Sequence, residues 1–136
     1  MSESLIVDAS AVVDLLIGAP AASAIRTRLS HNELHAPAHL DAEVLSAIGR
    51  HHRAGALSAD AVSLRLGILQ RMPIQRHQLA PLLSDAWNYR ENLRLADALY
   101  AALADRLRAP ILSTDRRLVA AIPAAEAPNA PETTGD

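Results

Sequence analysis

Acidic residues stand along this chain at places where predicted strands end or predicted helices begin. The run Leu5-Ile6-Val7 is apolar and rich in β-branched residues, as expected of a strand buried on both faces. It ends at Asp8, and Ser10 follows two residues later. Ligands of open α/β sheets bind just beyond the carboxyl ends of the strands. Asp8 is therefore either a turn former or the first member of a site, and further acids at the same edge decide between the two.

A second acid follows a second predicted strand. The segment 109–113 predicts a short strand, and Asp115 stands between it and a helix predicted over 116–121. Strands that alternate with helices predict a parallel sheet with helices on both faces, which is a three-layer α/β/α fold with a short central sheet. Because Asp8 and Asp115 both follow strands of that sheet, we expect them at the same edge.

Two predicted helices carry acids near their beginnings. The helix predicted over 40–53 contains Asp41 and Glu43, which point to different sides, and the helical wheel does not choose between them as a site residue. The helix predicted over 95–107 contains Asp97 in its first turn, where the helix dipole alone stabilises an acid. The apolar stripe that predicts the first of these helices comprises Leu40, Val44, Leu45 and Ile48.

The other segments continue the alternation of strands and helices. Trp87 and Tyr89 either stack on a nucleic-acid base or, as we favour, pack in the core or in an interface. We expect one domain over residues 1–127 and a disordered tail containing Pro and Thr over 128–136. The remaining predicted strands are 34–36, 74–79 and 124–127, and the remaining helical segments are 11–17, 21–29, 58–70 and 81–92.

Composition excludes several kinds of chemistry. The 136 residues include no Cys, which excludes disulfides, thiolate catalysis and a cysteine-based zinc site. All basic residues are Arg, and chemistry that needs a Lys is excluded as well. The net charge of -2 argues against a surface coated in positive charge. No apolar stretch approaches the roughly 20 residues of a membrane span, and we expect a soluble, cytoplasmic protein without a membrane partner.

Carboxylates that converge on one edge would repel one another unless some of them are protonated or bind a cation. With no Lys available, a hard divalent ion resolves this conflict, and Mg²⁺ or Mn²⁺ suits a site made of carboxylates. Such a site activates water and hydrolyses phosphodiesters. A metal stripe made of His31, His35 and His39 is disfavoured, because Pro37 lies between the second and third of them.

In this order and spacing, four motifs resemble the PIN-domain nucleases, and most closely the VapC-type toxins of toxin–antitoxin modules. They are Val7-Asp8-Ala9-Ser10-Ala11, Ala42-Glu43-Val44-Leu45-Ser46-Ala47, Leu95-Ala96-Asp97-Ala98 and Leu112-Ser113-Thr114-Asp115-Arg116. The resemblance covers roughly residues 5 to 127.

By resemblance, the catalytic and metal-binding acids are Asp8, Glu43, Asp97 and Asp115. The family pattern thus favours Glu43 over Asp41, and it gives no role to Asp14 or Thr114. It assigns Ser10 and Ser113 to a supporting or phosphate-contacting role, with Ser113 where many members have Thr. Phosphate contacts would fall to arginines near the cleft, of which Arg116 and Arg117 are the nearest in sequence.

What the resemblance implies is a Mg²⁺-dependent endoribonuclease that cuts structured RNA such as tRNA or rRNA, forms a homodimer and is neutralised by a cognate VapB-type antitoxin. Three alternatives stand beside it. A haloacid-dehalogenase phosphatase and a receiver domain also cluster acids at a strand edge, but both need a Lys that this chain lacks. A catalytically silent PIN-like binding module is the third.

Overall fold

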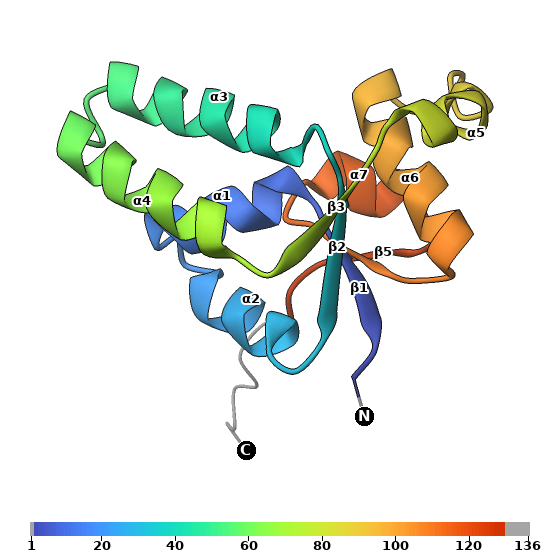
Figure 1. The fold of residues 1–136 in the computed structure, drawn as a ribbon, viewed down its shortest axis with the longest axis horizontal. Helices are drawn as coiled ribbons and strands as arrows, with labels where there is room; N and C mark the ends of the chain where they lie inside the picture. Colours follow the sequence, from blue (N-terminus) through green and yellow to red (C-terminus); the bar gives the residue numbers. More distant parts are fainter. Residues whose placement is uncertain (1, 130–136) are drawn as a thin grey trace.

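Five parallel strands form one sheet in the computed structural model, which describes residues 2–129 (Figure 1). The strand order is β3-β2-β1-β4-β5, and the order reverses at β1, which pairs with both β2 and β4. Ligands of such sheets bind at this switch point, beyond the carboxyl ends of the strands. The strands are β1 (Ser4–Val7), β2 (Glu33–Pro37), β3 (Ile74–His77), β4 (Ile111–Leu112) and β5 (Ala125–Glu126).

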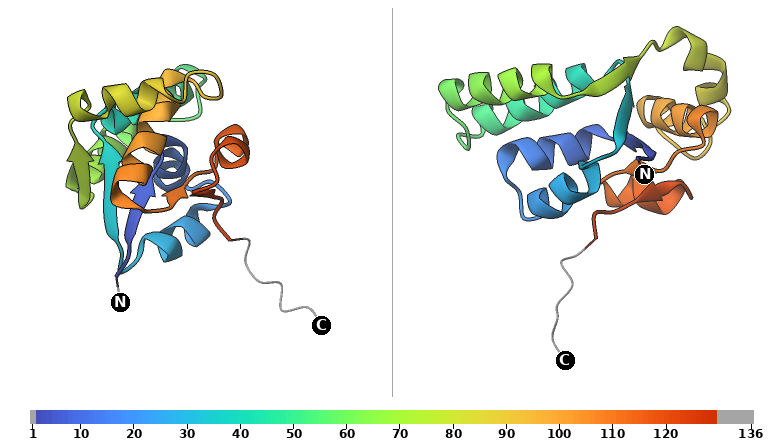
Figure 2. Two further views of the ribbon diagram at one scale, coloured as in Figure 1. Left: turned by 90° about the vertical axis from the view of Figure 1, so that its right-hand side faces the viewer. Right: turned by 60° about the horizontal axis from the view of Figure 1, so that its bottom comes forward.

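Helices cover both faces of the sheet, which confirms the predicted three-layer α/β/α fold (Figures 1 and 2). One face carries α1 (Ala9–Ile17), α2 (Ala22–Leu29), α3 (Leu40–Arg53) and α4 (Ala59–Arg71). The other face carries the 3₁₀ turn η1 (Ala80–Leu82), α5 (Leu83–Trp87), α6 (Leu95–Leu107) and α7 (Arg116–Ala121). The helices predicted over 40–53, 95–107 and 116–121 have these bounds in the structure.

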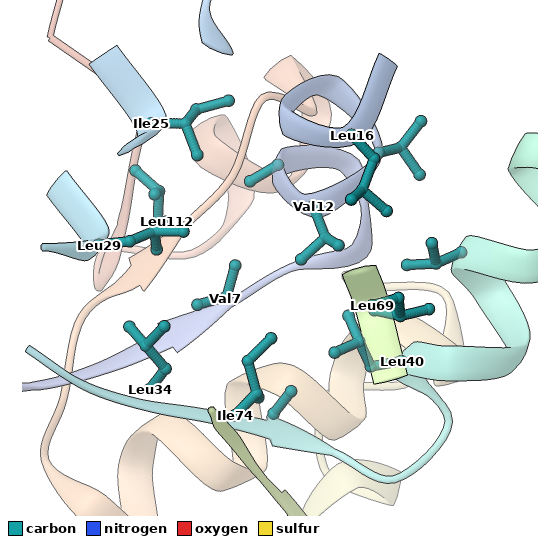
Figure 3. Packing of buried hydrophobic residues seen from close by; sticks show 14 of the residues in the cluster. Val7, Val12, Leu16, Ile25, Leu29, Leu34, Leu40, Leu69, Ile74 and Leu112 are labelled. Carbon is teal, nitrogen blue, oxygen red and sulfur yellow. The ribbon is translucent and has the colours of Figure 1, made fainter. Parts of the chain in front are cut away.

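Successive residues of β1 point to opposite faces and so belong to two separate cores. Leu5 and Val7 are buried against α1 to α4, while Ile6 between them is buried against α5, α6 and α7. Figure 3 shows Val7 and its neighbours on β2 and β3 pointing toward Val12 and Leu16 of α1. Each such buried side chain contributes about 1.5–3 kcal/mol, and a strand covered on both sides holds its carboxyl end in place.

The junction between β1 and α1 is tight. Asp8 is the N-cap of α1 in an extended conformation, and the helix starts at the next residue. The helix ends at Gly18, whose φ of 71° lies in the left-handed region that glycine adopts without strain. The acid after the first strand is therefore fixed between a buried strand and a buried helix.

The segment 81–92 differs from the prediction of a continuous helix. Helix α5 ends at Trp87, and the residues after it form successive turns in which the N–H of Tyr89 bonds the Ala86 carbonyl and that of Arg90 bonds the Trp87 carbonyl. The Tyr89 hydroxyl donates to Asp105 of α6. The structure thus replaces the end of the predicted helix with turns, and the Tyr89 hydroxyl links those turns to α6.

Two apolar side chains do not lie where the sequence placed them. Leu45, predicted in the buried stripe of α3, is 54% exposed, because α3 buries only Leu40, Val44 and Ile48. Trp87 is 55% exposed, with the Arg90 guanidinium 5.1 Å from its ring centroid. The prediction that Trp87 packs in the core is therefore wrong, whereas its packing in an interface stays a prediction.

Smaller differences concern the ends of the chain and of its strands. The strands predicted over 109–113 and 124–127 are shorter in the structure, at Ile111–Leu112 and Ala125–Glu126. Most of the predicted disordered tail, from residue 130 onward, lies outside the described residues. Within the described part of the chain, no single helix is long and apolar enough to cross a membrane; α1 and α2 meet that test only together, as a pair bent by 119°.

Candidate active site

Asp8 lies at the switch point and is almost fully buried, with 5% of its surface exposed. Its carboxylate Oδ2 accepts two hydrogen bonds, one from the Ser10 hydroxyl at 2.6 Å and one from the Ser113 hydroxyl at 2.8 Å. Ser10 lies in the first turn of α1 and Ser113 follows β4, so the neighbouring strands β1 and β4 bring the two serines together. The two hydroxyls orient one oxygen of Asp8.

Both serine hydroxyls also accept a backbone hydrogen bond. The N–H of Thr114 donates to Ser10 Oγ at 3.0 Å, and the N–H of Asp115 donates to Ser113 Oγ at 3.0 Å. With their hydrogens directed at Asp8, neither hydroxyl has a donor left for a phosphate, and Ser113 is fully buried. This arrangement favours the supporting role predicted for Ser10 and Ser113 over the phosphate-contacting one.

Glu43 in the first turn of α3 is held by two aromatic side chains. The hydroxyl of Tyr100, from the middle of α6, donates to Glu43 Oε1 at 2.7 Å, and Tyr100 itself is fully buried. His39 Nε2 lies 3.4 Å from the same oxygen, and the His39 and Tyr100 rings are 5.0 Å apart at their centroids. His39 Nε2 also lies 2.9 Å from the Ala96 carbonyl oxygen, which makes Nε2 the ring nitrogen that carries hydrogen.

Asp41, two residues before Glu43, is engaged elsewhere. The guanidinium of Arg76 on β3 binds it with both arms of its fork, Nη2 to Oδ1 at 3.0 Å and Nε to Oδ2 at 3.2 Å. The same guanidinium donates to three backbone carbonyls between α4 and β3, so this pair joins α3 to the edge of the sheet. Glu43 rather than Asp41 therefore faces the other acids, and its role as a site residue stays a prediction.

Asp97 and Asp115 approach the same edge from α6 and α7. Asp97 lies in the first turn of α6, and Asp115 is the N-cap of α7, where its Oδ1 accepts the N–H of Arg117 at 2.9 Å. Both side chains line a cavity of about 250 Å³. Asp115 is thus both a helix cap and a neighbour of Asp97, so its ordinary structural role does not remove it from the site.

The neighbouring acids influence the pKa values of Glu43 and Asp97. Burial raises the pKa of Glu43 above its usual value, Asp8 and Asp97 raise it further, and the Tyr100 hydrogen bond and His39 act in the opposite direction. Burial likewise raises the pKa of Asp97, with Asp8 and Asp115 adding to the rise and Arg94 and His39 opposing it. Burial, followed by the charges of Asp8 and Glu43, raises the pKa of the Tyr100 phenol, which keeps it a hydrogen-bond donor.

An all-oxygen donor set whose members repel one another fits the predicted divalent cation. Asp8 Oδ1, Glu43 Oε2 and Asp115 Oδ2 accept no hydrogen bond from residues 2–129 and remain available as ligands. In the described part of the chain, however, no three acidic or histidine side chains are close enough to hold one ion as they stand. Binding therefore requires side chains to turn toward a common point.

One arginine beside the acids is not singled out by the sequence. Arg94, the N-cap of α6, and Arg117 line the cavity of about 250 Å³ together with Asp97 and Asp115. Arg116, the predicted phosphate contact, instead lines a separate cavity of about 230 Å³ beside Ser113 and Val119. Arg94 carries no sequence signal of its own, since an arginine before a helix is ordinary.

Tyr100 and His39 are the other residues that sequence reasoning missed. Tyr100 was predicted on the buried side of α6 and is indeed buried, but nothing local shows that its hydroxyl reaches an acid 57 residues earlier. His39 belongs to a set of closely spaced histidines, and that spacing suggests only a metal stripe. A larger cavity, of about 740 Å³, lies between α2 and the segment after β5, and none of the four acids lines it.

Comparison with known proteins places this arrangement in a family. The model of the PIN domain matches residues 5–122. The chain belongs to the PIN-domain family. Among curated proteins, this PIN-domain chain is 51% identical over 126 residues to Ribonuclease VapC3 of Mycobacterium tuberculosis, covering 92% of each chain. It is 36% identical to Ribonuclease VapC12 of the same species over 115 residues, covering 84% of this chain and 88% of VapC12.

Solved structures show the same fold at low identity. A Pyrobaculum aerophilum protein, PAE2754, superposes with a TM-score of 0.70 at 22% identity, covering 91% of this chain and 83% of its own. Mycobacterium tuberculosis VapC20, a toxin that cleaves the sarcin-ricin loop, gives 0.66 at 15% identity, with 86% and 94% covered. A toxin–antitoxin complex from Klebsiella pneumoniae gives 0.63 at 16%, with 93% and 99% covered. By the family model and the curated relatives, the PIN-domain chain belongs to the VapC-type ribonuclease toxins.

Proposed function

We propose that this chain is a Mg²⁺-dependent endoribonuclease toxin that hydrolyses phosphodiester bonds in cellular RNA, with Mn²⁺ as a substitute ion. The observation that carries the proposal is the convergence of Asp8, Glu43, Asp97 and Asp115 on one edge of the sheet, where neighbouring carboxylates raise the pKa values of Glu43 and Asp97. The 51% identity to a ribonuclease of the VapC type supports the same chemistry.

The four acids would hold the ion through the oxygens that they do not use within the protein. Asp8 is the most rigid of them, because two serine hydroxyls hold one of its oxygens and leave the other free. Glu43 is likewise held through Oε1 by Tyr100. When bound, Mg²⁺ supplies an activated water and neutralises charge on the phosphoryl oxygens. The carboxylates would position that ion beyond the carboxyl ends of the strands, where ligands of open α/β sheets bind.

The test compares the wild-type chain with Asp8→Asn, which keeps the side-chain size and one oxygen. Purified wild-type protein is expected to cut tRNA or rRNA with Mg²⁺ or Mn²⁺ and to stop growth when expressed in bacteria. Asp8→Asn is expected to lose activity by about a thousandfold, because the most deeply held charge of the site is removed. Gel electrophoresis of the RNA and growth curves provide the readouts.

Two outcomes favour the alternatives. If the wild-type protein cuts no RNA with either ion and both forms are equally harmless, a catalytically silent PIN-like binding module is the better description. If the wild-type protein instead releases phosphate from a monoester such as p-nitrophenyl phosphate, the phosphatase alternative gains. EDTA should abolish cleavage by removing the ion, and addition of excess Mg²⁺ should restore it.

The family and one exposed surface support an antitoxin as a protein partner. Leu64 and Ile68 on α4 are 70% and 46% exposed and stand one helical turn apart, and Leu45 is exposed on α3 beside it. We infer that this apolar surface receives a cognate VapB-type antitoxin. A toxin–antitoxin complex among the similar structures supports such a partner. Co-expression with the antitoxin should abolish the toxicity of the wild-type chain. The Leu64→Asp variant should remain toxic in the same co-expression, which tests this surface.

The homodimer and the cytoplasmic location remain predictions. Analytical ultracentrifugation of the purified chain tests the dimer, and a chain that sediments as a monomer at every concentration contradicts it. Cell fractionation tests the location.

A further inference from the structure

Asp8, Glu43, Asp97 and Asp115 lie along one edge of the sheet, the carboxylate edge. This edge poses an electrostatic problem for an RNA substrate. Four acids meet there, so even one bound divalent ion leaves the edge negative, and the chain as a whole carries a net charge of -2. An RNA backbone is itself a polyanion, and its approach is opposed unless cations stand beside the acids. The location of free positive charge near the edge therefore indicates where the backbone can lie.

Several arginines are paired with acids away from the cavity at Asp97 and Asp115. Arg76 binds Asp41, Arg28 pairs with Glu126 at 2.6 Å, and Arg106 lies 3.7 Å from Asp85. Arg90 lies over the Trp87 ring and beside Glu91. These side chains join elements of the fold and do not line the cavity at Asp97 and Asp115.

Arg94 and Arg117 differ from them. Both side chains are exposed, both line the cavity of about 250 Å³, and neither forms an ion pair with any acid in residues 2–129. They come from different elements, since Arg94 precedes α6 and Arg117 lies in the first turn of α7. A guanidinium fork matches a phosphate group and can bind it with two parallel hydrogen bonds.

We propose that Arg94 and Arg117 form a phosphate-binding subsite beside Asp97 and Asp115, which holds an RNA backbone phosphate adjacent to the scissile one. The inference rests on the proposed ribonuclease function and adds the position of the strand. It replaces Arg116 as the main phosphate contact, because Arg116 lines a different cavity. The backbone then runs over the part of the edge formed by α6 and α7.

The experiment measures RNA binding separately from cleavage. A short fluorescein-labelled single-stranded RNA of mixed sequence is titrated with Asp8→Asn protein, in which hydrolysis is blocked, at several salt concentrations. Arg94→Ala and Arg117→Ala are introduced singly and together. Both changes keep the backbone groups that shape the helix starts, namely the Arg94 carbonyl that accepts from Ala98 and the Arg117 N–H that donates to Asp115. Arg26→Ala on α2 is a control with the same change of charge.

Each of the two substitutions is expected to weaken RNA binding by roughly tenfold and to reduce the slope of log K against log salt by about 0.7, the value for one phosphate contact on a single strand. Arg116→Ala should have a smaller effect than its neighbour Arg117→Ala. In the wild-type background, the double variant should raise KM more than it lowers kcat.

The outcomes separate this inference from the proposed function. Equal losses for Arg26→Ala and Arg117→Ala, or a larger loss for Arg116→Ala, would overturn the subsite. An unchanged slope in a protein whose wild-type form cuts RNA would also overturn it while leaving the ribonuclease function intact. A reduced slope in a protein that cuts no RNA would instead support the subsite as an RNA-binding surface and reject the nuclease.

Discussion

The two sides of the carboxylate edge are built differently. On the side of α3, the buried Tyr100 donates a hydrogen bond to one oxygen of Glu43, and the His39 ring lies 3.4 Å from the same oxygen. On the side of α6 and α7, Asp97 and Asp115 line an open cavity with two arginines that have no acid partner in the described residues. The α3 side restricts the Glu43 side chain, whereas the α6–α7 side leaves a cavity beside charged side chains.

This difference indicates a division of tasks. A carboxylate whose rotamer is fixed by a buried donor is preorganised as a ligand, and its orientation need not be established when an ion arrives. A cavity with free guanidinium groups can accept a phosphate without breaking an internal pair. On this interpretation, the α3 side supplies a preoriented ligand for the ion, and the α6–α7 side adds Asp97 and Asp115 as ligands and also receives the RNA.

The sharpest test of the α3 side uses two acids of one helix. Glu43→Gln should lower RNA cleavage by roughly a hundredfold or more, because it removes a charge from the ion site while keeping an oxygen for Tyr100. Asp41→Asn should change cleavage less than about twofold, because Asp41 binds Arg76 and not the edge. Initial rates of RNA cleavage at saturating Mg²⁺ provide the measurement.

Thermal unfolding serves as the control for both variants. Asp41→Asn is expected to cost at most about 1 kcal/mol, since the Asp41 side chain is 47% exposed and such pairs contribute little. Equal losses of cleavage in the two variants would mean that α3 contributes through its stability alone, and the distinction between Glu43 and Asp41 would be lost.

A smaller effect is expected from the hydroxyl that holds Glu43. Tyr100→Phe keeps the ring but leaves Glu43 Oε1 without its 2.7 Å donor, and affinity for Mn²⁺ should fall by roughly tenfold. Isothermal titration calorimetry measures this without reference to activity. Tyr89→Phe is the matched control, because Tyr89 also donates to a carboxylate, that of Asp105, away from the edge. If both variants bind Mn²⁺ like the wild type, Tyr100 serves only the core.

The smallest effect concerns pH. In the unfolded chain Asp97 titrates near its ordinary pKa of 3.8, whereas burial and the neighbouring acids raise its pKa in the folded chain. Between these two values the folded state binds more protons, so the free energy of unfolding falls as pH rises through that window. Asp97→Asn should therefore raise the Tm of the metal-free protein by roughly 2 °C at neutral pH, and less at pH 3.

Calorimetric scans across pH test this sign. Glu91→Gln, which removes an exposed acid after α5, should show no such difference between pH 3 and neutral pH. Addition of Mg²⁺ should reverse the order, because the ion stabilises Asp97 in its charged form. If Asp97→Asn lowered the Tm at neutral pH without metal, repulsion among the acids would not be the dominant effect at this edge.

Much of the fold could be predicted from periodicity and strand-end chemistry. The helices over 40–53, 95–107 and 116–121 were correct because apolar spacing and capping residues are local signals. The helix predicted over 81–92 was too long, because the residues after Trp87 form turns, which Tyr89 links to Asp105 on a later helix. The exposure of Leu45 and Trp87 likewise depends on which neighbours each helix face meets.

The sequence by itself determined the alternation of strands and helices along the chain. This alternation brings Asp8 and Asp115 to one edge, because parallel strands end on the same side of a sheet. Only the tertiary structure decided that Glu43 rather than Asp41 faces the other acids, and that Arg94 joins Arg117 beside them. Those outcomes depend on Arg76, Tyr100 and the cavity at α6 and α7, which meet their partners across long stretches of chain. Local propensity carries no information about such contacts, because packing the layers together creates them.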